Sequence, residues 1–298
     1  SQSLYRDVYM CLSWCAVETH RVRLGPRVIN PLTRHPAIAA SAAATLEEMA
    51  PGRTMLGIGT GDSAVLNLGL KPSTRALLAE YVRTVRQLLK TGEAEWQGRH
   101  CRLTWWSGSV PIYLAASGPK MLELAGEIAD GVIINTGLTP EIIRDSIDHV
   151  RSGAERGGRS LSEIDMWWLP LTNLREQQTD AFEEIAMTLA SAGSHLSRFT
   201  TTGKHIPPDL YDAVVELGHR YRTDQHDKPD SQNRELIKEL GLFDYLANRF
   251  AVAGTVEDCV EKLNKAIDAG ARQFWMSIHF DHKEEFLRKW AAVIRRYQ

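Results

Sequence analysis

The sequence predicts an α/β protein of the (β/α)8 barrel class. Short runs rich in Val, Ile and Leu alternate with longer segments of helical period, which is typical of parallel βα units. Glycines and small polar residues follow the ends of several of these runs. The predicted strands cover residues 21–28, 54–59, 111–115, 131–135, 165–171 and 273–279.

Two of the intervening segments carry a clear apolar helix face. In the first, this face comprises Leu77, Leu78, Tyr81, Val82, Val85, Leu88 and Leu89. In the second, it comprises Val256, Val260, Leu263 and Ile267. Thr255 and Asp258 have the spacing of a capping box at the start of the second helix.

The strand count is lower than a full barrel requires, because eight units normally occupy about 250 residues. Residues 1–20 read as the tail of a unit, with Val8, Leu12, Cys15 and Ala16 on a helix. We therefore expect a barrel that lacks its first unit and most of its second strand. Either the sequence begins partway into the natural protein, or the barrel itself is incomplete.

Residues 1–298 are expected to form one barrel domain. Two segments of it are longer than the connections of a minimal barrel. Residues 92–109 contain three tryptophans and are interpreted as a hairpin or lid. Residues 172–248 are long and largely helical, and long insertions in compact domains are usually functional or disordered. We predict that residues 172–248 form a helical insertion before the last unit that caps the barrel mouth.

Composition excludes several classes of function. The 298 residues include 35 basic and 37 acidic side chains, so no field would gather nucleic acid or an anionic membrane surface. Four scattered cysteines do not make a disulfide framework, and no apolar run reaches the roughly 20 residues of a membrane helix. We expect a cytoplasmic protein that acts on a small molecule.

The unusual residues follow strands at their carboxyl ends, at positions 59–62, 116–118, 135–137 and 277–279. In a barrel these ends share one face, where active sites lie. Gly57, Gly59 and Gly61 would let a ligand approach the backbone there. The alternative is that glycine only serves tight turns, and for a single loop the two interpretations weigh equally.

A second loop favours an anionic ligand. Ser117 and Gly118 precede a helix whose first turn contains Pro119, and the free N–H groups of a helix start bind phosphate. Lys120 could add a positive charge. A dinucleotide site is not supported at the first loop, because Glu80, about 20 residues on, lies inside a helical segment rather than at the end of a strand.

A metal site is not predicted. His279, Asp281 and His282 cluster near a helix entrance, but two histidines and an aspartate at this spacing match no zinc pattern well. A metal-dependent barrel hydrolase would need histidine and carboxylate ligands at strand ends, and these cannot be assembled from the sequence.

Three ordered stretches resemble the luciferase-like flavin and deazaflavin oxidoreductases. They are VRLGPRVINPLTRHPAIAASAAATLEEMAPGR, MLGIGTGDSAV and VPIYLAASGPKMLELAGEIADGVI, with a looser match in TVEDCVEKLNKAIDAGARQFWM. The resemblance covers residues 22–135 well and the rest sparsely. It implies a TIM-type barrel that holds a cofactor ring at the carboxyl ends of its strands.

The resemblance also assigns residues. Val28 would support the ring, with a cis peptide bond possible between Arg27 and Val28, and Asn30 would contact the ring. The residues expected at the ribityl chain and phosphate of the cofactor are Gly59, Thr60, Gly61, Ala116, Ser117, Gly118, Lys120 and Met121.

Asp62 occupies the position of an acidic residue that takes part in proton transfer in the sugar-phosphate dehydrogenases of this family. The alternative is that Asp62 only caps the following helix. Val65 departs from the asparagine of those dehydrogenases, which weakens that substrate assignment. The family's acidic residue and histidine near the second strand would fall at or before Ser1, where the sequence reads Ser-Gln-Ser.

The resemblance implies an oxidoreductase that uses coenzyme F420 or FMN and transfers a hydride between the bound ring and a small organic substrate. One alternative is an FMN-dependent monooxygenase that uses reduced flavin and oxygen. Another is a non-catalytic cofactor-binding barrel or partner subunit. A homodimer is expected, without nucleic-acid or membrane partners.

Overall fold

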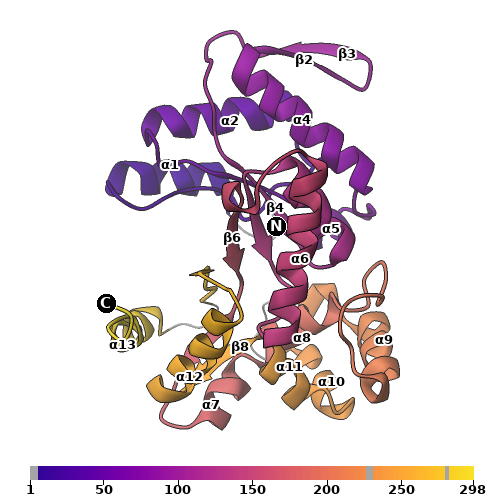
Figure 1. Ribbon diagram of the computed structural model, residues 1–298, viewed down its shortest axis with the longest axis vertical. Coiled ribbons are helices and arrows are strands. Elements are labelled where there is room, and N and C mark those ends of the chain that lie inside the picture. Colours follow the sequence, from indigo (N-terminus) through magenta and orange to yellow (C-terminus); the bar gives the residue numbers. More distant parts are fainter. Residues whose placement is uncertain (1–5, 226–230, 279–281) are drawn as a thin grey trace. The chain divides into compact units, whose positions relative to one another are not determined.

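The computed structural model describes residues 6–225, 231–278 and 282–298 of the chain. Its contacts divide the chain into two compact units. The first comprises Ser1–Ala116, Lys120–Ile133 and His149–Asp165. The second comprises Ser117–Pro119, Ile134–Asp148 and Met166–Gln298. Both units combine helices with parallel strand pairs, which confirms the predicted α/β class (Figure 1).

The first unit is drawn in indigo to magenta in Figure 1. Three of its elements, α5, β5 and α6, cross into the second unit. Its elements are α1 (Val8–Glu18), α2 (Pro36–Met49), β1 (Leu56–Ile58), α3 (Ser63–Leu66), α4 (Arg75–Thr91), β2 (Glu93–Trp96), β3 (Arg99–Arg102), β4 (Ile112–Ala116), α5 (Pro119–Ile128), β5 (Gly131–Ile134) and α6 (Pro140–Arg156).

The sheet of the first unit places β4 between β1 and β5. β1 and β4 run parallel, with Leu56 opposite Ile112 and Ile58 opposite Leu114, so both strands end at the same edge. The predicted strand at 21–28 contains only one parallel bridge, from Leu24 to Thr54, and a second bridge joins the next residue, Ile29, to Ile58. Pro26 lies between the bridges and has no N–H to donate to a ladder.

The tryptophan-rich segment forms the predicted hairpin, β2–β3, in which Glu93 pairs with Arg102 and Trp96 with Arg99. Gln97 and Gly98 both have positive φ, as a two-residue type I′ turn requires. The Trp96 ring contacts Tyr81 of α4 edge to face, with ring centroids 5.6 Å apart. The hairpin therefore packs along α4.

Helix α4 follows the predicted face closely. Its buried residues are Leu78, Ala79, Tyr81, Val82, Thr84, Val85, Leu88 and Leu89. Helix α2, which packs on α4, buries four alanines, and small side chains let two helices approach closely. Thr74 caps α4 by accepting the Leu77 N–H at 3.2 Å.

Glycines also bring α5 and α6 together. A Cβ on Gly153 would lie 1.9 Å from the carbonyl oxygen of Glu123, and one on Gly126 would lie 2.1 Å from that of Val150. The Glu123 carboxylate then contacts Arg156 at 3.0 Å and His149 at 3.1 Å on α6. The helix backbones therefore touch where no side chain intervenes.

The second unit contains the remaining elements. They are β6 (Asp165–Trp168), whose first residue belongs to the first unit, β7 (Leu171–Leu174), α7 (Gln178–Glu184), α8 (Ala186–Ser194), α9 (Tyr211–Arg220), α10 (Gln232–Glu239), α11 (Phe243–Phe250), β8 (Ala251–Gly254), α12 (Val256–Asp268), β9 (Gln273–Phe274) and α13 (Lys283–Ile294). β6 pairs in parallel with β9, and β7 with β8.

The sequence interpretation missed strand β8, which follows directly on α11. Predicted strand 165–171 is divided into β6 and β7 around Leu169 and Pro170. The capping box of α12 is confirmed, since Asp258 Oδ2 accepts from the Thr255 N–H at 2.9 Å. The buried face of α12 is Cys259, Leu263 and Ala266, rotated by about one residue from the predicted face.

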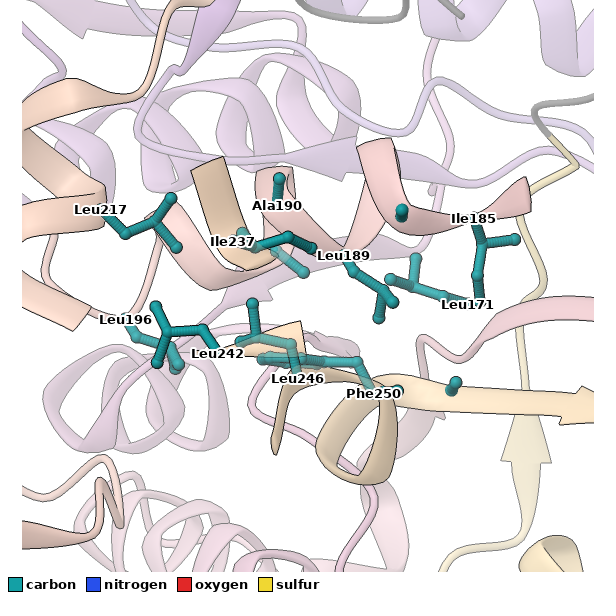
Figure 2. Packing of buried hydrophobic residues seen from close by; sticks show 14 of the residues in the cluster. Leu171, Ile185, Leu189, Ala190, Leu196, Leu217, Ile237, Leu242, Leu246 and Phe250 are labelled. Carbon is teal, nitrogen blue, oxygen red and sulfur yellow. The ribbon is translucent and has the colours of Figure 1, made fainter. Parts of the chain in front are cut away.

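The core of the second unit is formed by helices of the predicted insertion together with β7 and β8 (Figure 2). Leu189 of α8, Leu246 of α11 and Phe250 of α11 are fully buried and point into it (Figure 2). Each such side chain contributes roughly 1.5–3 kcal/mol when removed from water. Whether these helices cap a barrel mouth stays a prediction.

Candidate functional site

The alternating glycines make room for a neighbouring segment of the same chain. The peptide bond between Arg27 and Val28 is cis, as the resemblance implies. A Cβ on Gly57 would lie 2.3 Å from the carbonyl oxygen of Pro26, and one on Gly59 would lie 3.0 Å from Cγ2 of Val28. These two glycines are therefore required by the 26–28 segment.

Asn30 and Gly61 meet at the end of β1. A Cβ on Gly61, whose φ is +100°, would lie 3.7 Å from Cβ of Asn30 and 2.4 Å from Cγ2 of Val65. The buried Asn30 side chain accepts hydrogen bonds at Oδ1 from the N–H groups of Leu32 and Thr33, both at 3.0 Å. The structure thus brings Val28, Asn30, Gly59 and Gly61 to one edge.

Thr60 and Asp62 continue this edge. The Thr60 carbonyl accepts from the Ser73 N–H at 2.8 Å and from its hydroxyl at 3.0 Å. Asp62 precedes the short helix α3, but its carboxylate makes no capping hydrogen bond there. The alternative role as a side-chain cap is therefore wrong, and the role in proton transfer stays a prediction.

Lys204 supplies a positive charge beside the start of α5. Its side chain is only 6% exposed, and a Cβ on Gly118 would lie 3.4 Å from Lys204 Cε. The Lys204 ammonium donates to the carbonyl oxygens of His195 at 2.8 Å and Arg198 at 2.9 Å. Its third hydrogen has no acceptor among the residues that the structure describes.

Arg249 is a second buried cation in the same unit. Its Nε donates to the Thr136 carbonyl at 2.9 Å, and its Nη1 donates to the His205 carbonyl at 3.0 Å and the Tyr245 hydroxyl at 2.7 Å. A Cβ on Gly137 would lie 2.8 Å from Cγ of Arg249, so glycine is required there. Within the described part of the chain, Arg249 Nη2 makes no hydrogen bond.

Neither cation forms an ion pair within the described chain, although the charge of the Glu141 carboxylate acts to raise the pKa of Arg249. Burial lowers the pKa of Lys204 to about 8, and the positive charges of Arg249 and Arg198 act in the same direction. Burial likewise lowers the pKa of Arg249. Buried charges are normally paired. The Lys204 ammonium lies beside the start of α5, and the N-terminus of a helix favours negative charge.

The remaining predicted site residues in this part of the chain are Ala116, Lys120 and Met121. Ala116 is buried as the last residue of β4, Lys120 is exposed and Met121 is half-buried. Their assignment to the cofactor phosphate stays a prediction, as does the assignment of Val28, Asn30 and Gly59–Gly61 to the ring side.

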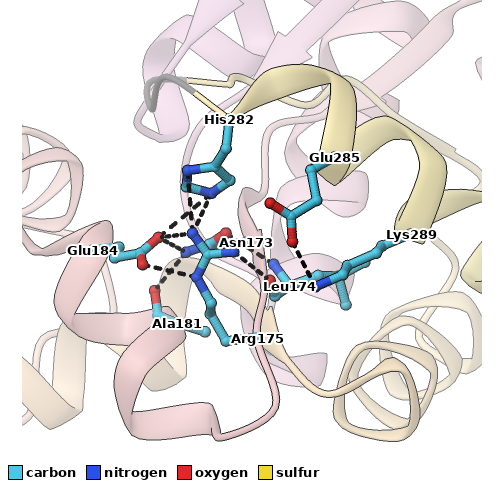
Figure 3. A network of polar contacts seen from close by, with 8 residues as sticks. All are labelled: Asn173, Leu174, Arg175, Ala181, Glu184, His282, Glu285 and Lys289. Atoms are coloured by element: carbon cyan, nitrogen blue, oxygen red, sulfur yellow. Dashed lines mark hydrogen bonds and ion pairs between the residues drawn. The ribbon is translucent and has the colours of Figure 1, made fainter.

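Histidine 282 belongs to an ion-pair network (Figure 3). Arg175 pairs with the Glu184 carboxylate at 2.7 Å, and His282 contacts the same guanidinium and lies 3.6 Å from that carboxylate. His279 and Asp281 lie outside the described residues. Among the residues that are described, no group of three or more potential ligands could hold a metal ion.

Sequence reasoning missed Lys204 and Arg249. Lys204 lies in the polar stretch TTTGKHIPP, where Gly203 has positive φ and a Cβ on it would lie 2.6 Å from Cγ of Pro119. Arg249 sits between Leu246 and Phe250 on the apolar face of α11. A charged residue on an apolar helix face was the signal available for Arg249.

A comparison with protein families identifies the chain. The model of the luciferase-like monooxygenases matches residues 1–273. The chain belongs to the luciferase-like monooxygenase family. This confirms the predicted family and its oxidoreductase class.

Two similar proteins are a reductase and a dehydrogenase. The chain is 30% identical over 283 residues to 5,10-methylenetetrahydromethanopterin reductase of Methanolobus tindarius, covering 90% of this chain and 81% of that one. It is 39% identical over 160 residues to F420-dependent glucose-6-phosphate dehydrogenase of Nakamurella multipartita, covering 49% and 47%.

A solved structure is similar over the whole chain. It is the coenzyme F420 dependent tetrahydromethanopterin reductase of Methanopyrus kandleri, with a TM-score of 0.75 and 26% identity. The match covers 100% of this chain and 90% of the other. Separately, none of the helices in the described residues has the length and hydrophobicity to cross a membrane.

Proposed function

We propose that this protein is an oxidoreductase that binds coenzyme F420 and transfers a hydride between its deazaflavin ring and a small organic substrate. The observation that carries this proposal is the buried Lys204 ammonium beside Gly118, with one hydrogen left for an anion. Its chemistry fits a phosphate group on the tail of a cofactor.

The tail has suitable partners in the second unit. Free N–H groups at the start of α5 would donate to phosphate oxygens, and the positive end of the helix dipole favours negative charge there. Lys204 would add a charge-assisted hydrogen bond, which is about twice as strong as a neutral one. Arg249 holds the 203–206 segment through the His205 carbonyl and so positions Lys204.

The first unit would support the ring. By the resemblance, Val28 would lie under the ring and Asn30 at its edge, with Thr60 and Gly61 near the ribityl chain. When bound, the deazaflavin supplies a carbon centre that accepts or donates the hydride. By the resemblance, the Asp62 carboxylate would hold or release the proton of the substrate.

The choice between coenzyme F420 and FMN follows the relatives. The reductase of Methanopyrus kandleri and the dehydrogenase of Nakamurella multipartita carry F420 in their names. An FMN-dependent monooxygenase and a non-catalytic barrel or partner subunit remain the competing functions. No contact in the described residues favours either of them over the F420 enzyme.

The finer architecture is part of the proposal. We infer that the strands close into a (β/α)8 barrel and that the helices of residues 172–248 cap its mouth. Support comes from the parallel pairing of β1 with β4 and of β6 with β9, and from the likeness to a family member over the whole chain. A crystal structure with open sheet edges would contradict it.

We also propose that two copies associate through α1. Met10, Trp14 and Val17 are 75%, 73% and 65% exposed, and their spacing forms an apolar stripe on one side of the helix. If two α1 helices pair antiparallel around a two-fold axis, the exposed Arg6 of one lies near the exposed Glu18 of the other. The apolar stripe of one copy then faces the stripe of the other, and the opposite charges at the ends of the pair attract each other.

Cofactor binding by the purified protein tests the proposed activity. Purified protein is titrated with F420 and with FMN while ring fluorescence is followed, and the cofactor released from cell-derived protein is identified by mass. We expect F420 to bind more tightly. Tight FMN binding without F420 binding would favour the monooxygenase, and binding of neither would refute the proposal.

Two variants separate binding of the cofactor's phosphate tail from the hydride-transfer step. Lys204→Met should weaken F420 affinity by about 10- to 100-fold, since a charge-assisted hydrogen bond contributes about 1.5–3 kcal/mol, whereas Lys90→Met, at an exposed position in the last turn of α4, is the matched control. Asp62→Asn should leave F420 affinity unchanged and lower the rate of hydride transfer at least 100-fold. Equal loss of affinity in both lysine variants would contradict the role of Lys204.

A further inference from the structure

Four buried side-chain polar atoms of the first unit have no hydrogen-bond partner among the described residues, and three of them belong to neighbouring side chains. These three are the hydroxyl of Tyr9, Nε of Arg34 and the hydroxyl of Tyr81. They come from α1, from the loop before α2 and from α4. Buried polar groups in native proteins are nearly always hydrogen-bonded, so three exceptions in one region require an explanation.

The three side chains are neighbours. The guanidinium carbon of Arg34 lies 4.9 Å from the centre of the Tyr9 ring. Tyr81 is fully buried, and burial raises the pKa of both phenols. The charge of Arg34 acts against that rise at Tyr9 and at Tyr81, which places the guanidinium close to both.

Contacts on all sides hold these groups in place. Asp7 Oδ2 accepts from Nη2 of Arg34 at 2.7 Å, and Asp7 Oδ1 caps α1 through the N–H groups of Tyr9 and Met10. The Tyr81 ring packs edge-on against Trp96. The Arg34 guanidinium and the Tyr81 ring are therefore held by contacts of their own.

We propose that a buried water molecule bridges the Tyr9 hydroxyl, Arg34 Nε and the Tyr81 hydroxyl. Water accepts from Nε–H and can donate to or accept from each phenol, and a buried water makes about three hydrogen bonds to groups that otherwise lack them. An anion would be repelled by the adjacent Asp7 carboxylate, and an apolar ligand would satisfy none of the three atoms.

This water ties together three segments of the first unit. Arg34 lies four residues after Asn30, in the loop that follows the cis peptide bond, and the water links that loop to α1 and α4. The site is separate from the proposed cofactor residues. It therefore holds whether or not the proposed activity is correct.

Single and double phenylalanine variants test for the bridging water. The readouts are the direction of each change in Tm and whether the two changes add. Tyr9→Phe and Tyr81→Phe should each lower the Tm by a few degrees, because each leaves the water one partner short. The double variant should lose less than the sum, since the first substitution already weakens the binding of the shared water and the second then removes less. Tyr211→Phe, whose hydroxyl is on the exposed surface of α9, is the matched control and should not change the Tm.

The opposite results are equally clear. A dry site predicts that removing an orphaned hydroxyl leaves the Tm unchanged or raises it, and either result overturns the proposal. Fully additive losses would refute one shared water. A high-resolution crystal structure should contain density within hydrogen-bond distance of all three atoms, and an empty site in that map would also overturn it.

Discussion

Lys204 is the residue that most distinguishes this chain's site, because its charge is held in a buried place without a carboxylate. Such a group is costly in the absence of a ligand and becomes favourable when an anion takes the third hydrogen. Its lowered pKa follows from the same burial. The burial that makes the Lys204 charge unfavourable without a ligand is therefore also what suits it to bind an anion.

The pH dependence of cofactor binding follows from this pKa. Below about 8, Lys204 is charged and donates to the anion, and above about 8 the charge is lost. F420 affinity should therefore fall by about 10-fold as pH rises through this window, although bound phosphate shifts the midpoint upward. The measurement is the F420 dissociation constant from pH 6.5 to 9.5.

The control for this prediction is the Lys204→Met variant. Its affinity should be low and nearly flat across the same pH range, because the titrating group is absent. A wild-type profile that does not change, or a fall of equal size in the variant, would assign the pH dependence to another group.

Glycines with the same predicted role differ in which atoms lie beside them in the structure. Gly57 and Gly59 were expected to admit a ligand, yet the Pro26 carbonyl and the Val28 side chain already occupy the space beside them. Gly118 instead faces Lys204. The spacing of glycines revealed a crowded backbone, but sequence alone could not say what crowds it.

At the scale of elements, close backbone contact joins α5 to α6. The Gly153 position leaves 1.9 Å between an added Cβ and the Glu123 carbonyl, which no rotamer change can relieve. The salt bridge between Glu123 and Arg156 spans the same crossing. Such half-exposed ion pairs contribute little, so the crossing depends on packing.

Gly153→Ala should therefore destabilise the protein by about 2–3 kcal/mol, since the added methyl group forces the two helix backbones apart. This exceeds the roughly 1 kcal/mol that alanine gains over glycine in a helix. Urea unfolding followed by circular dichroism measures the effect. The exposed Glu155→Ala on the same helix is the control, and a stabilised Gly153→Ala variant would show that the helices do not touch there.

Helix identities were predictable because their apolar period is long, whereas short strands were not. The buried face of α4 agrees with the prediction almost residue for residue. The segment 21–28 and β8 were misjudged: the first pairs only at the Leu24 bridge, and the second has four residues that follow a helix without a break. Neither feature leaves a period in the sequence.

At the scale of the whole molecule, the exposed stripe on α1 is the surface that we propose as the interface between two copies. Contiguous exposed apolar side chains on a soluble protein usually mark an interaction site. The native cysteines Cys11 and Cys15 are both exposed on the same helix. A pair of α1 helices would bring these thiols near their counterparts.

We expect the protein to sediment as a dimer and to form a covalent dimer with a short bis-maleimide. Trp14→Arg should shift it to monomer by placing like charges at the two-fold axis, whereas Leu287→Arg, an exposed residue on α13, should leave it dimeric. A wild-type monomer, or a dimer unaffected by Trp14→Arg, would contradict pairing through α1.

The sequence by itself determined the α/β class, the family, the main helices and the loops that carry the unusual residues, because these depend on local period and on motifs. Only the tertiary structure decided which groups carry charge next to those loops. Lys204 and Gly118 are 86 positions apart in the sequence, and no local pattern records that their side chain and backbone meet. Burial and partnering, which set charge and pKa, are properties of the folded neighbourhood.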